Sequence, residues 1–412
     1  MRFLKLLFPV TVIFFIVWTI AFFSGDSEII PKGVNEDDGV NGGESVEVEP
    51  LQGVWLSYTE IGDLVQGNAV EEYRDKVTEM MEKFSVTGIN TVFYHGRAFC
   101  DSLYYSDIFP ASKALCVNTV SELTFDPLRE FLDIAKKYGV RVHLWLNPYR
   151  ISYNSDYSKL PDKSPAKTLY EQNKASLIIC DKGIFLNPAC SEARSLVLKG
   201  IKEALDNYDL DGVHFDDYFY PSAEELGDGE MYKQYKKQGG SLTLAQWRRE
   251  NVNSLVSSVY ALVKSHSQAM LFSISPAADI EKCTDVFYAD VRKWATTEGY
   301  VDYLIPQIYF GFENSTAPFN DVVREWERLA SGGCVRLACG LGAYKCGSKD
   351  ENAGEGAKEW IENRNILARQ YEVLQKSGLW HGFVLFSYSY CYGDNVNEIS
   401  KIEIKNLANM VK

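Results

Sequence analysis

The chain has 412 residues, of which 46% are hydrophobic and 13% aromatic, and its formal net charge is −14. This length and apolar content suffice for one large core, such as a single α/β barrel of about 250 residues or more. The acidic balance argues against nucleic acid as a partner, since phosphate backbones are bound by basic surfaces. The many aromatic side chains also suit a cleft that stacks against sugar rings.

The first 23 residues are expected to form a membrane-spanning helix. Arg2 and Lys5 precede an uncharged stretch over residues 6–23, which is just long enough to cross a bilayer. Positive charges before such a stretch favour export of the residues on its carboxyl side. Because the small-residue pattern of a cleavage site is weak, we expect a signal-anchor that holds an extracytoplasmic protein at the membrane, with secretion as the alternative if the segment is cleaved.

Residues 24–50 are expected to form a disordered linker. They hold eight acidic residues against one lysine, with Gly, Asn and Pro and no apolar periodicity. Residues 51–412 have the composition of a folded catalytic domain, and we find no internal repeat or second domain in them. The sequence therefore predicts an exported barrel on an acidic tether.

The nine cysteines show no CxxC spacing, which argues against a zinc ribbon or a thioredoxin-like motif. Outside the cytoplasm Cys100 could pair with Cys116, and Cys180 with Cys190. Cys334 and Cys339 lie near or in a predicted strand, and we expect them to be buried thiols.

From residue 51 onward, apolar runs alternate with amphipathic helical stretches. The predicted strands are 53–57, 89–97, 140–147, 211–217, 269–276, 301–310, 335–344 and 382–388. A helix follows most of them; the one after the second strand should begin with Asp126 as N-cap and Pro127 in its first turn. Eight strands in strand-then-helix order predict a (β/α)8 TIM barrel. A doubly wound sheet is the alternative, but the segment after the first strand lacks a Gly-rich phosphate loop.

Polar side chains cluster where the predicted strands end, which is where TIM barrels carry their active sites. These residues are His95, Arg97, Asp101 and Tyr104; His143, Trp145, Asn147, Tyr149 and Arg150; His214, Asp216, Asp217 and Tyr218; Ser275 and Asp279; and Gln307, Tyr309 and Glu313. The adjacent aspartates 216 and 217 end the fourth strand and are the first candidates for chemistry.

Strand parity gives the two aspartates different positions. Val213 and Phe215 are apolar and should face the helices, so His214 and Asp216 should face the barrel interior. Asp217 has the other parity unless the strand has already ended. Since glycoside hydrolysis needs two carboxylates across the sugar bond, a partner from another strand is expected. Glu313 is favoured over the other mouth carboxylates, which are Glu60, Asp101 and Asp279.

Seven motifs, in order along the chain, carry a resemblance to a known family. They are GVWLS, NPYR, LNPACSEARS, DGVHFDDYFYP, WRRENVNSLV, ISP and VDYLIPQIYF. Over residues 51–390 the chain resembles the glycosyl-hydrolase-like family 10 barrels of bacterial cell envelopes. The resemblance implies a TIM barrel, export and hydrolysis of a glycosidic bond, and some members act on peptidoglycan glycan strands, particularly those lacking stem peptides.

The segment DGVHFDDY is also similar to the DGxDxDxE strand of family 18 chitinases. Asp216 keeps one of that motif's acidic positions, whereas His214 replaces another and Tyr218 stands where the catalytic Glu would be. This departure argues against the substrate-assisted mechanism of chitinases.

Three functions fit these observations. The first is a glycoside hydrolase acting on envelope polysaccharide without cofactor or metal, with Asp216, Asp217 and Glu313 as catalytic groups. Its sugar-binding residues would be Arg97, Asp101, His143, Trp145, Asn147, Tyr149, His214, Tyr218, Gln307 and Tyr309. The second is a metal-dependent carbohydrate hydrolase of the deacetylase type, with the histidines as ligands. The third is a sugar-binding envelope protein without catalysis.

Each candidate also has an ordinary structural explanation. Asp216 and Asp217 could be a solvated strand end or a helix cap. His95, His143 and His214 could be hydrogen-bonding core residues. Arg97 could pair with Asp101, or it could bind a substrate carboxylate such as a lactyl group.

Overall fold

The structure is a computed structural model, and it describes residues 49–411 except 118, 224, 225 and 395. Eight parallel strands close into a barrel in the order β1-β2-β3-β7-β8-β9-β10-β11. Their bounds are β1 Leu51–Leu56, β2 Thr91–Arg97, β3 Arg141–Leu146, β7 Gly212–Phe215, β8 Leu271–Ile274, β9 Tyr303–Leu304, β10 Arg336–Leu341 and β11 Trp380–Leu385. Each predicted strand is present, and the predicted TIM barrel is confirmed.

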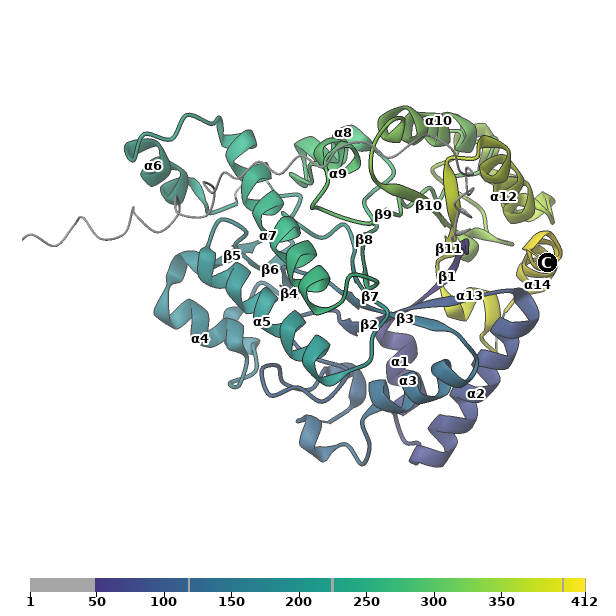
Figure 1. Cartoon of the computed structure of the whole chain (residues 1–412), viewed down its shortest axis with the longest axis horizontal. Coiled ribbons are helices and arrows are strands. Elements are labelled where there is room, and N and C mark those ends of the chain that lie inside the picture. The colour runs from purple at the N-terminus through teal and green to yellow at the C-terminus, as the bar shows by residue number, and fades with distance from the viewer. Residues whose placement is uncertain (1–48, 118, 224–225, 395, 412) are drawn as a thin grey trace, which may run out of the picture. The chain divides into compact units, whose positions relative to one another are not determined.

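Helices surround the barrel (Figure 1). Their bounds are α1 Tyr58–Val65, α2 Val70–Thr87, α3 Pro127–Lys137, α4 Pro165–Gln172, α5 Ser191–Asn207, α6 Gly229–Lys237, α7 Leu244–His266, α8 Ile280–Asp285, α9 Val291–Thr296, α10 Phe319–Ala330, α11 Glu359–Glu362, α12 Ile366–Ser377, α13 Tyr388–Tyr392 and α14 Glu398–Val411. Local sequence sets their starts. At α3 the Asp126 side chain accepts hydrogen bonds from the backbone N–H groups of Leu128 and Arg129, as the predicted cap requires.

Aromatic and aliphatic side chains fill the barrel interior. One buried cluster comprises Leu51, Trp55, Phe93, Trp145, Tyr303, Ile305, Ala338 and Val384. His214 lies among these rings, with its ring centroid 4.5 Å from that of Phe93. Val213 and Phe215 instead belong to the larger cluster between the strands and the helices. The predicted parity of β7 up to Phe215 is therefore confirmed.

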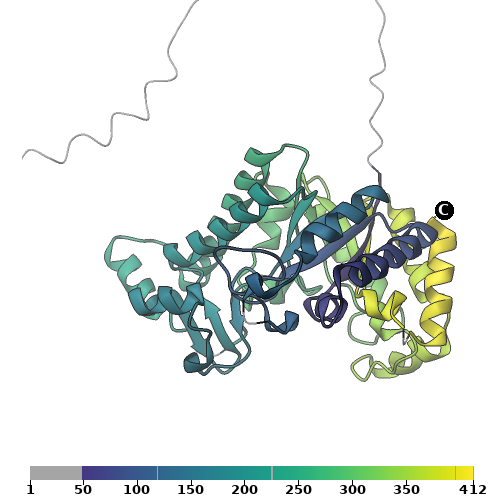
Figure 2. The same ribbon diagram turned by 90° about the horizontal axis from the view of Figure 1, so that it is seen from below.

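The first and last elements of the domain close the barrel. β1 pairs with β11 in parallel, and outside this pair α2 and α14 pack side by side (Figures 1 and 2). Lys83 of α2 donates a hydrogen bond of 3.2 Å to the carbonyl oxygen of Tyr392. Gly88 ends α2 with a φ of 77°, and a Cβ there would lie 2.5 Å from Cγ1 of Val411. This position therefore needs glycine both for its conformation and for the close approach of α14.

A small antiparallel sheet, which the sequence did not reveal, is inserted between β3 and α5. It has the order β4-β6-β5, with β4 Arg150–Ser152, β5 Leu177–Cys180 and β6 Gly183–Leu186. The backbone N–H of Leu186 donates to the carbonyl oxygen of Tyr149 at 2.7 Å. The insertion thus fixes the segment that directly follows β3.

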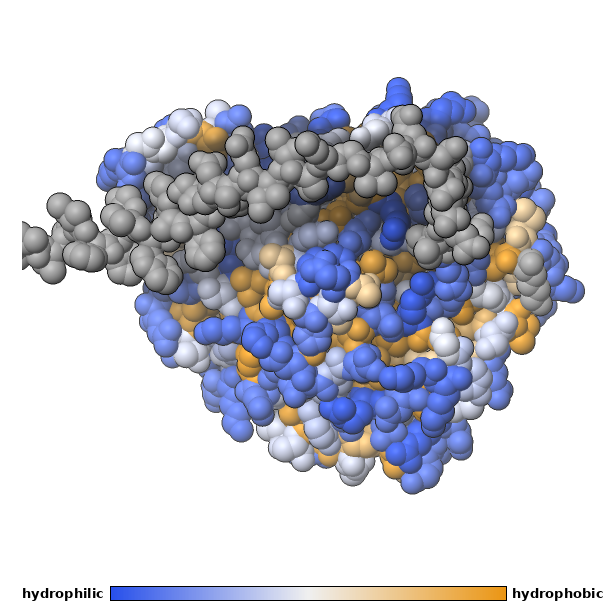
Figure 3. Space-filling view, viewed as in Figure 1, coloured by the Kyte–Doolittle hydropathy of each residue, from blue (hydrophilic) through white to orange (hydrophobic). Residues whose placement is uncertain are grey.

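On the face in view, hydrophilic residues dominate the outer rim and apolar residues show between them nearer the centre (Figure 3).

Two predictions about the cysteines need correction. All nine cysteines are free thiols, so the pairs Cys100–Cys116 and Cys180–Cys190 do not form disulfides. Cys339 is buried as expected, but Cys334 is exposed.

The predicted membrane-spanning segment at 1–23 lies outside the described residues, as does nearly all of the predicted linker. Across 49–411, with the gaps given above, no helix is long and apolar enough to cross a membrane. The structure thus gives no support to a helix that holds the protein at a membrane. The localisation and the membrane partner inferred from it are therefore not retained.

Candidate active site

A pocket of about 180 Å³ opens where the barrel strands end at their carboxyl termini. Its lining residues follow or end seven of the eight strands and also come from the inserted sheet. They are Trp55, Ser57, Tyr58, His95, Trp145, Arg150, Tyr153, Asp216, Asp217, Tyr218, Ser275, Gln307, Tyr309 and Phe386. This is the end of a TIM barrel at which catalytic groups are found.

Asp216 is a buried carboxyl in this pocket, with 3% of its surface exposed. Its Oδ2 accepts a hydrogen bond of 3.3 Å from the indole Nε1 of Trp145, and its Oδ1 accepts one of 3.3 Å from the backbone N–H of Tyr218. Burial, and next the negative charge of Asp217, raise the pKa of Asp216 to about 8. At neutral pH this carboxyl can therefore hold a proton.

Asp217 also lines the pocket, because β7 ends at Phe215 and strand parity no longer applies to it. Its Oδ1 accepts a hydrogen bond of 3.3 Å from the amide of Gln307, whose Nε2 also donates to the carbonyl oxygen of Ser275 at 3.0 Å. Burial raises the pKa of Asp217, while a backbone N–H and the Gln307 amide oppose that rise. The two carboxyl groups thus share one pocket but have different hydrogen-bond partners. Different surroundings of this kind can push the pKa values of two carboxyl groups apart, so that one acts as an acid and the other as a base.

His214 supports the floor beneath this pair without lining the pocket. Its Nε2 lies 3.2 Å from the indole Nε1 of Trp55, and its Nδ1 lies 2.8 Å from Oγ of Ser273. An indole N–H can only donate, so Nε2 carries the lone pair and Nδ1 donates to Ser273. Burial holds the pKa of His214 well below its usual range. This histidine is a neutral, fixed hydrogen-bonding residue.

His95 orients the tryptophan that contacts Asp216. Its ring stacks on Trp145 with centroids 3.5 Å apart and planes 10° apart. Its Nε2 lies 3.2 Å from Oδ1 of Asn147, whose Nδ2 donates to the carbonyl oxygen of Ala98 at 2.9 Å. Asn147 therefore holds His95, and His95 holds the indole whose N–H reaches Asp216.

Arg150 lines the same pocket as a buried cation, with 4% of its surface exposed. Its Nη1 donates to the hydroxyl oxygen of Tyr153 at 2.8 Å, and its Nε donates to a backbone carbonyl oxygen at 3.2 Å. Its guanidinium carbon lies 4.3 Å from the ring centroid of Tyr218, 4.7 Å from that of Tyr153 and 4.9 Å from that of Phe99. Both hydrogen-bond partners are uncharged, and no carboxylate among the described residues forms an ion pair with it.

The structure brings six of the predicted site residues together around this pocket. They are Asp216, Asp217, Trp145, Tyr218, Gln307 and Tyr309. Seven others do not line it: Glu313, Arg97, Asp101, His143, Asn147, Tyr149 and His214. Of these, Asn147 and His214 support residues that do.

Glu313 is exposed and lies outside the pocket, so the structure does not place it with the aspartates. Its loop is held by Glu359, whose Oε2 accepts a hydrogen bond of 2.9 Å from the backbone N–H of Glu313. Glu60, another of the considered partners, receives hydrogen bonds from Ser387 and from the backbone N–H groups of Ser57 and Ser389. It thereby joins the start of α1 to the end of β11.

Arg97 points away from the pocket because the register of β2 shifts between His95 and Arg97. Its guanidinium lies 4.6 Å from the ring centroid of Phe109 and is buried against α5. His143 lies deeper in the barrel against Phe93, with burial lowering its pKa to about 3. Tyr149 is fully buried, with its ring edge-on to that of Phe219. These three predicted sugar contacts are not at the pocket surface.

Asp101 lines a neighbouring cavity of about 300 Å³ rather than the pocket itself. The two hollows share Tyr58 and Tyr153 in their walls. Burial raises the pKa of Asp101 to about 6. The two hollows therefore adjoin at these two tyrosines.

Several lining residues were not predicted as sugar contacts. Trp55 lies near the end of the first strand, Ser57 and Tyr58 follow it, Phe386 follows the last strand, and Tyr153 follows the inserted β4. The strand-end rule applies to the first and last strands as well and would have identified four of these residues. Tyr153 had no such signal, because β4 forms only through pairing with a distant segment.

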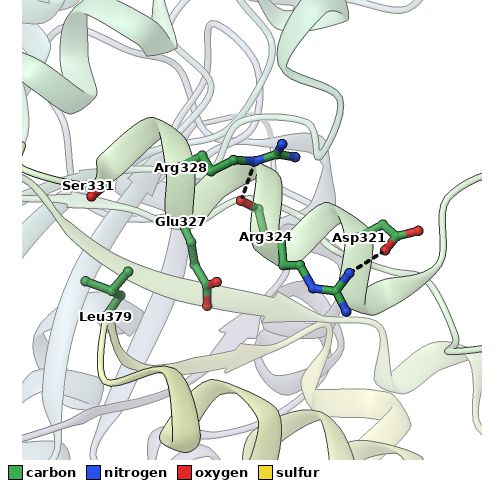
Figure 4. Close-up of a pocket in the computed structure, with 6 residues that line it drawn as sticks. All are labelled: Asp321, Arg324, Glu327, Arg328, Ser331 and Leu379. Atoms are coloured by element: carbon green, nitrogen blue, oxygen red, sulfur yellow. Dashed lines mark hydrogen bonds and ion pairs between the residues drawn. The ribbon is translucent and has the colours of Figure 1, made fainter.

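A larger hollow of about 490 Å³ lies along α10, between that helix and the segment before β11 (Figure 4). Arg324 forms an ion pair of 3.0 Å with Asp321 at its edge, and Glu327 and Leu379 line it. Ser331 and Leu379 precede β10 and β11, so this hollow lies toward the amino ends of the strands. That end of a TIM barrel serves stability rather than catalysis.

Within the part of the chain that the structure describes, no three His, Cys, Asp or Glu side chains gather in a way that could hold a metal ion. His95 and His214, two ligands of the metal-centre alternative, instead contact the side chains of Asn147, Trp55 and Ser273. Both histidines are thus held by protein groups.

Comparison with known proteins places these features in context. A family model described as glycosyl hydrolase-like 10 matches residues 50–360. Glycosyl hydrolase YngK of Bacillus subtilis (strain 168) is 30% identical over 331 residues, which cover 76% of this chain and 64% of that protein. Glycosyl hydrolase DigH of Escherichia coli (strain K12) is 28% identical over 375 residues, covering 83% of this chain and 84% of that protein. The match thus spans less than two thirds of YngK but most of DigH.

Two solved structures show the same fold at low identity. The PgaB (BpsB) glycoside hydrolase domain from Bordetella bronchiseptica aligns with a TM-score of 0.58 at 13% identity, covering 88% of this chain and 99% of that one. The catalytic domain of beta-amylase from Paenibacillus polymyxa aligns with a TM-score of 0.57 at 10% identity, covering 88% of this chain and 98% of that one. Both support the barrel architecture.

Proposed function

Because the chain belongs to the glycosyl hydrolase-like 10 family, we propose that it hydrolyses glycosidic bonds and that Asp216 and Asp217 carry out the reaction. This proposal rests on one observation: both carboxyl groups lie in one pocket at the barrel mouth, and each accepts hydrogen bonds from different partners. This differs from our expectation of a partner on another strand, since the neighbouring residue itself supplies the second carboxylate.

In the proposed reaction Asp216 is the acid. Its raised pKa keeps a proton on the carboxyl at neutral pH, and this proton passes to the glycosidic oxygen as the bond from that oxygen to the anomeric carbon breaks. The electron pair of the broken bond stays on the leaving oxygen. Asp217, held by the Gln307 amide, is the ionised carboxylate that stabilises the positive charge developing at the anomeric carbon.

Water completes the reaction at the anomeric carbon and gives its proton to a carboxylate of the pair. The sugar would be positioned by the aromatic walls of the pocket, chiefly Trp145, Tyr218 and Tyr309. Trp145 is held on one face by the stacked ring of His95 and at its edge by the hydrogen bond that its Nε1 donates to Asp216. A fixed ring of this kind suits stacking against a sugar face.

We propose polysaccharide of the bacterial cell envelope as the substrate, with the glycan strands of peptidoglycan as its most specific form. The support is the family resemblance described above and the aromatic pocket at the barrel mouth. Incubation with peptidoglycan, both intact and stripped of its peptides, followed by mass spectrometry of the products, would identify the bond and the substrate together.

The decisive experiment replaces each aspartate by its amide. Asp216→Asn and Asp217→Asn should each reduce turnover of glycan strands by about 100-fold or more, since a positioned acid or base contributes about that much. Glu313→Gln is the matched control, because it makes the same change on an exposed side chain outside the pocket. It should keep full activity.

Circular dichroism should show that all three variants are folded. Full activity in Asp216→Asn would refute the proposal, and loss of activity in Glu313→Gln would return that residue to the mechanism. Tight binding of glycan by the unaltered chain without any turnover would instead favour a sugar-binding protein.

A further inference from the structure

We infer that a chloride ion binds between the guanidinium groups of Arg97 and Arg150, in a small cavity that separates the ends of β2 and β3 from α5. Two buried positive charges without ion-pair partners in the described part of the chain border this cavity. The site is distinct from the sugar pocket and does not depend on the proposed function.

Arg97 ends β2 as a buried cation, with 2% of its surface exposed. Within the described residues its guanidinium makes no ion pair or hydrogen bond, and its Nη1 is buried without a partner. α5 leaves room for this group through Gly200, because a Cβ there would collide with Nη1 and with the ring of Phe109. That ring, 4.6 Å from the guanidinium, offsets part of the cost of burying the charge. A buried charge without a counter-charge nevertheless remains costly.

Arg150 brings a second buried positive charge to the same cavity. Of the five N–H donors of a guanidinium, two have partners, and both partners are uncharged: the hydroxyl of Tyr153 and the carbonyl oxygen of Ala98. The side chain of Asn147 donates to the same carbonyl oxygen at 2.9 Å, and its backbone N–H donates to the carbonyl oxygen of Arg97 at 2.8 Å. These hydrogen bonds fix the backbone that carries the two cations.

The nearby acids do not neutralise these cations. Burial raises the pKa of Asp101 to about 6, and the positive charges of Arg97 and Arg150 oppose this rise only in part. Asp101 forms no ion pair with either arginine and lines the neighbouring cavity of about 300 Å³ instead. The two aspartates of the sugar pocket accept their side-chain hydrogen bonds from Trp145 and Gln307, not from Arg150. A counter-charge at ion-pair distance must therefore come from a bound anion.

The size of the cavity limits which anion can enter. Its volume is about 10 Å³, which is about the space that one water molecule needs. A water molecule would accept hydrogen bonds but leave both charges uncompensated. Phosphate and carboxylates have several heavy atoms, whereas chloride is a single atom. The remaining walls are largely apolar, so that the attraction between ion and guanidinium is weakly screened; they include Phe99, Phe109, Pro148, Leu186, Leu196 and Val197.

Urea unfolding tests this site without any sugar. The unaltered chain is unfolded in mixtures of sodium chloride and sodium gluconate at constant ionic strength and pH, because gluconate is too large for the cavity. An ion that binds only the folded chain lowers the equilibrium constant of unfolding, so above the dissociation constant each tenfold rise in chloride should lower it about tenfold. Arg97→Met should abolish this dependence on chloride, and Arg97→Lys should retain a weaker one. Arg324→Met is the matched control, since Arg324 is 65% exposed and lies outside the cavity; it should keep the full dependence.

Crystals of the unaltered chain grown in sodium bromide locate the ion directly, because bromide scatters anomalously. A peak between the two guanidinium groups is expected. An unfolding equilibrium constant that is the same in chloride and in gluconate would overturn the inference, and so would a chloride dependence that Arg97→Met leaves unchanged. If the Met variant does not fold, the crystals decide: a water molecule without an anomalous peak in the cavity would overturn the inference. Neither measurement uses turnover, so the outcome is separate from that of the proposed function.

Discussion

Replacing Asp216 by Asn should change how the stability of the protein depends on pH. The pKa of this buried carboxyl is raised from 3.8 to about 8, first by burial and then by the charge of Asp217. Between these values the folded chain keeps a proton that the unfolded chain releases. The contribution of Asp216 to stability is thus fully present below about pH 4 and is lost as pH rises toward about 8.

The size of this loss follows from proton linkage. One proton held by the folded state alone lowers the free energy of unfolding by about 1.4 kcal/mol for each pH unit. As the pH rises from 5 to 7.5, Asp216 should therefore lower the free energy of unfolding of the unaltered protein by about 3 kcal/mol. The Asn variant has no proton to lose at this position, so it should gain about that much stability relative to the unaltered protein over the same interval.

Urea unfolding at several pH values between 5 and 7.5, followed by tryptophan fluorescence and by circular dichroism, measures this difference. Coincidence of the two signals checks that unfolding is two-state. Glu313→Gln makes the same chemical change on an exposed side chain and should follow the unaltered protein at each pH. Parallel curves for Asp216→Asn and the unaltered protein would refute the reasoning, because they would mean that the folded state holds no extra proton on Asp216.

Two further substitutions test how the surroundings of the site are held. Asp228→Asn should lower the free energy of unfolding by about 3–5 kcal/mol, because Asp228 is fully buried and forms an ion pair of 2.6 Å with Arg248. A loss of less than about 1 kcal/mol in urea unfolding would contradict this. Trp55→Phe removes the indole N–H that donates to Nε2 of His214 at 3.2 Å, so it should lower the free energy of unfolding by about 1–3 kcal/mol. Urea unfolding measures this loss, and an unchanged urea midpoint would contradict the prediction.

The elements that were predicted correctly depend on local patterns. Apolar runs of strand length separated by amphipathic helices define the eight strands, and Asp126 followed by Pro127 marks the start of α3. Because parallel strands of a barrel end at one rim, placing the strands also brought six of the predicted site residues together around one pocket. For this reason local patterns alone were enough to assign Asp216, Trp145 and Gln307 to the barrel mouth.

The predictions that failed depend on contacts between distant segments. The register of β2 shifts between His95 and Arg97, and of these two strand-end residues only His95 lines the pocket. Glu313 belongs to a loop that Glu359 holds through backbone hydrogen bonds, and nothing near Glu313 in the sequence indicates this. The inserted sheet that positions Arg150 arises from pairing with residues far along the chain. Neither periodicity nor spacing contains this information.

The pairing of β1 with β11, and of α2 with α14 outside it, has a consequence during synthesis. β1 emerges from the ribosome first, but its partner β11 ends at Leu385, close to the end of the chain. At about 5–20 residues per second, β1 waits on the order of tens of seconds with one edge unpaired. An open strand edge invites pairing with other chains, so the nascent protein is prone to aggregate until β11 is made and pairs with β1. Any truncation ahead of β11 would make that vulnerable state permanent.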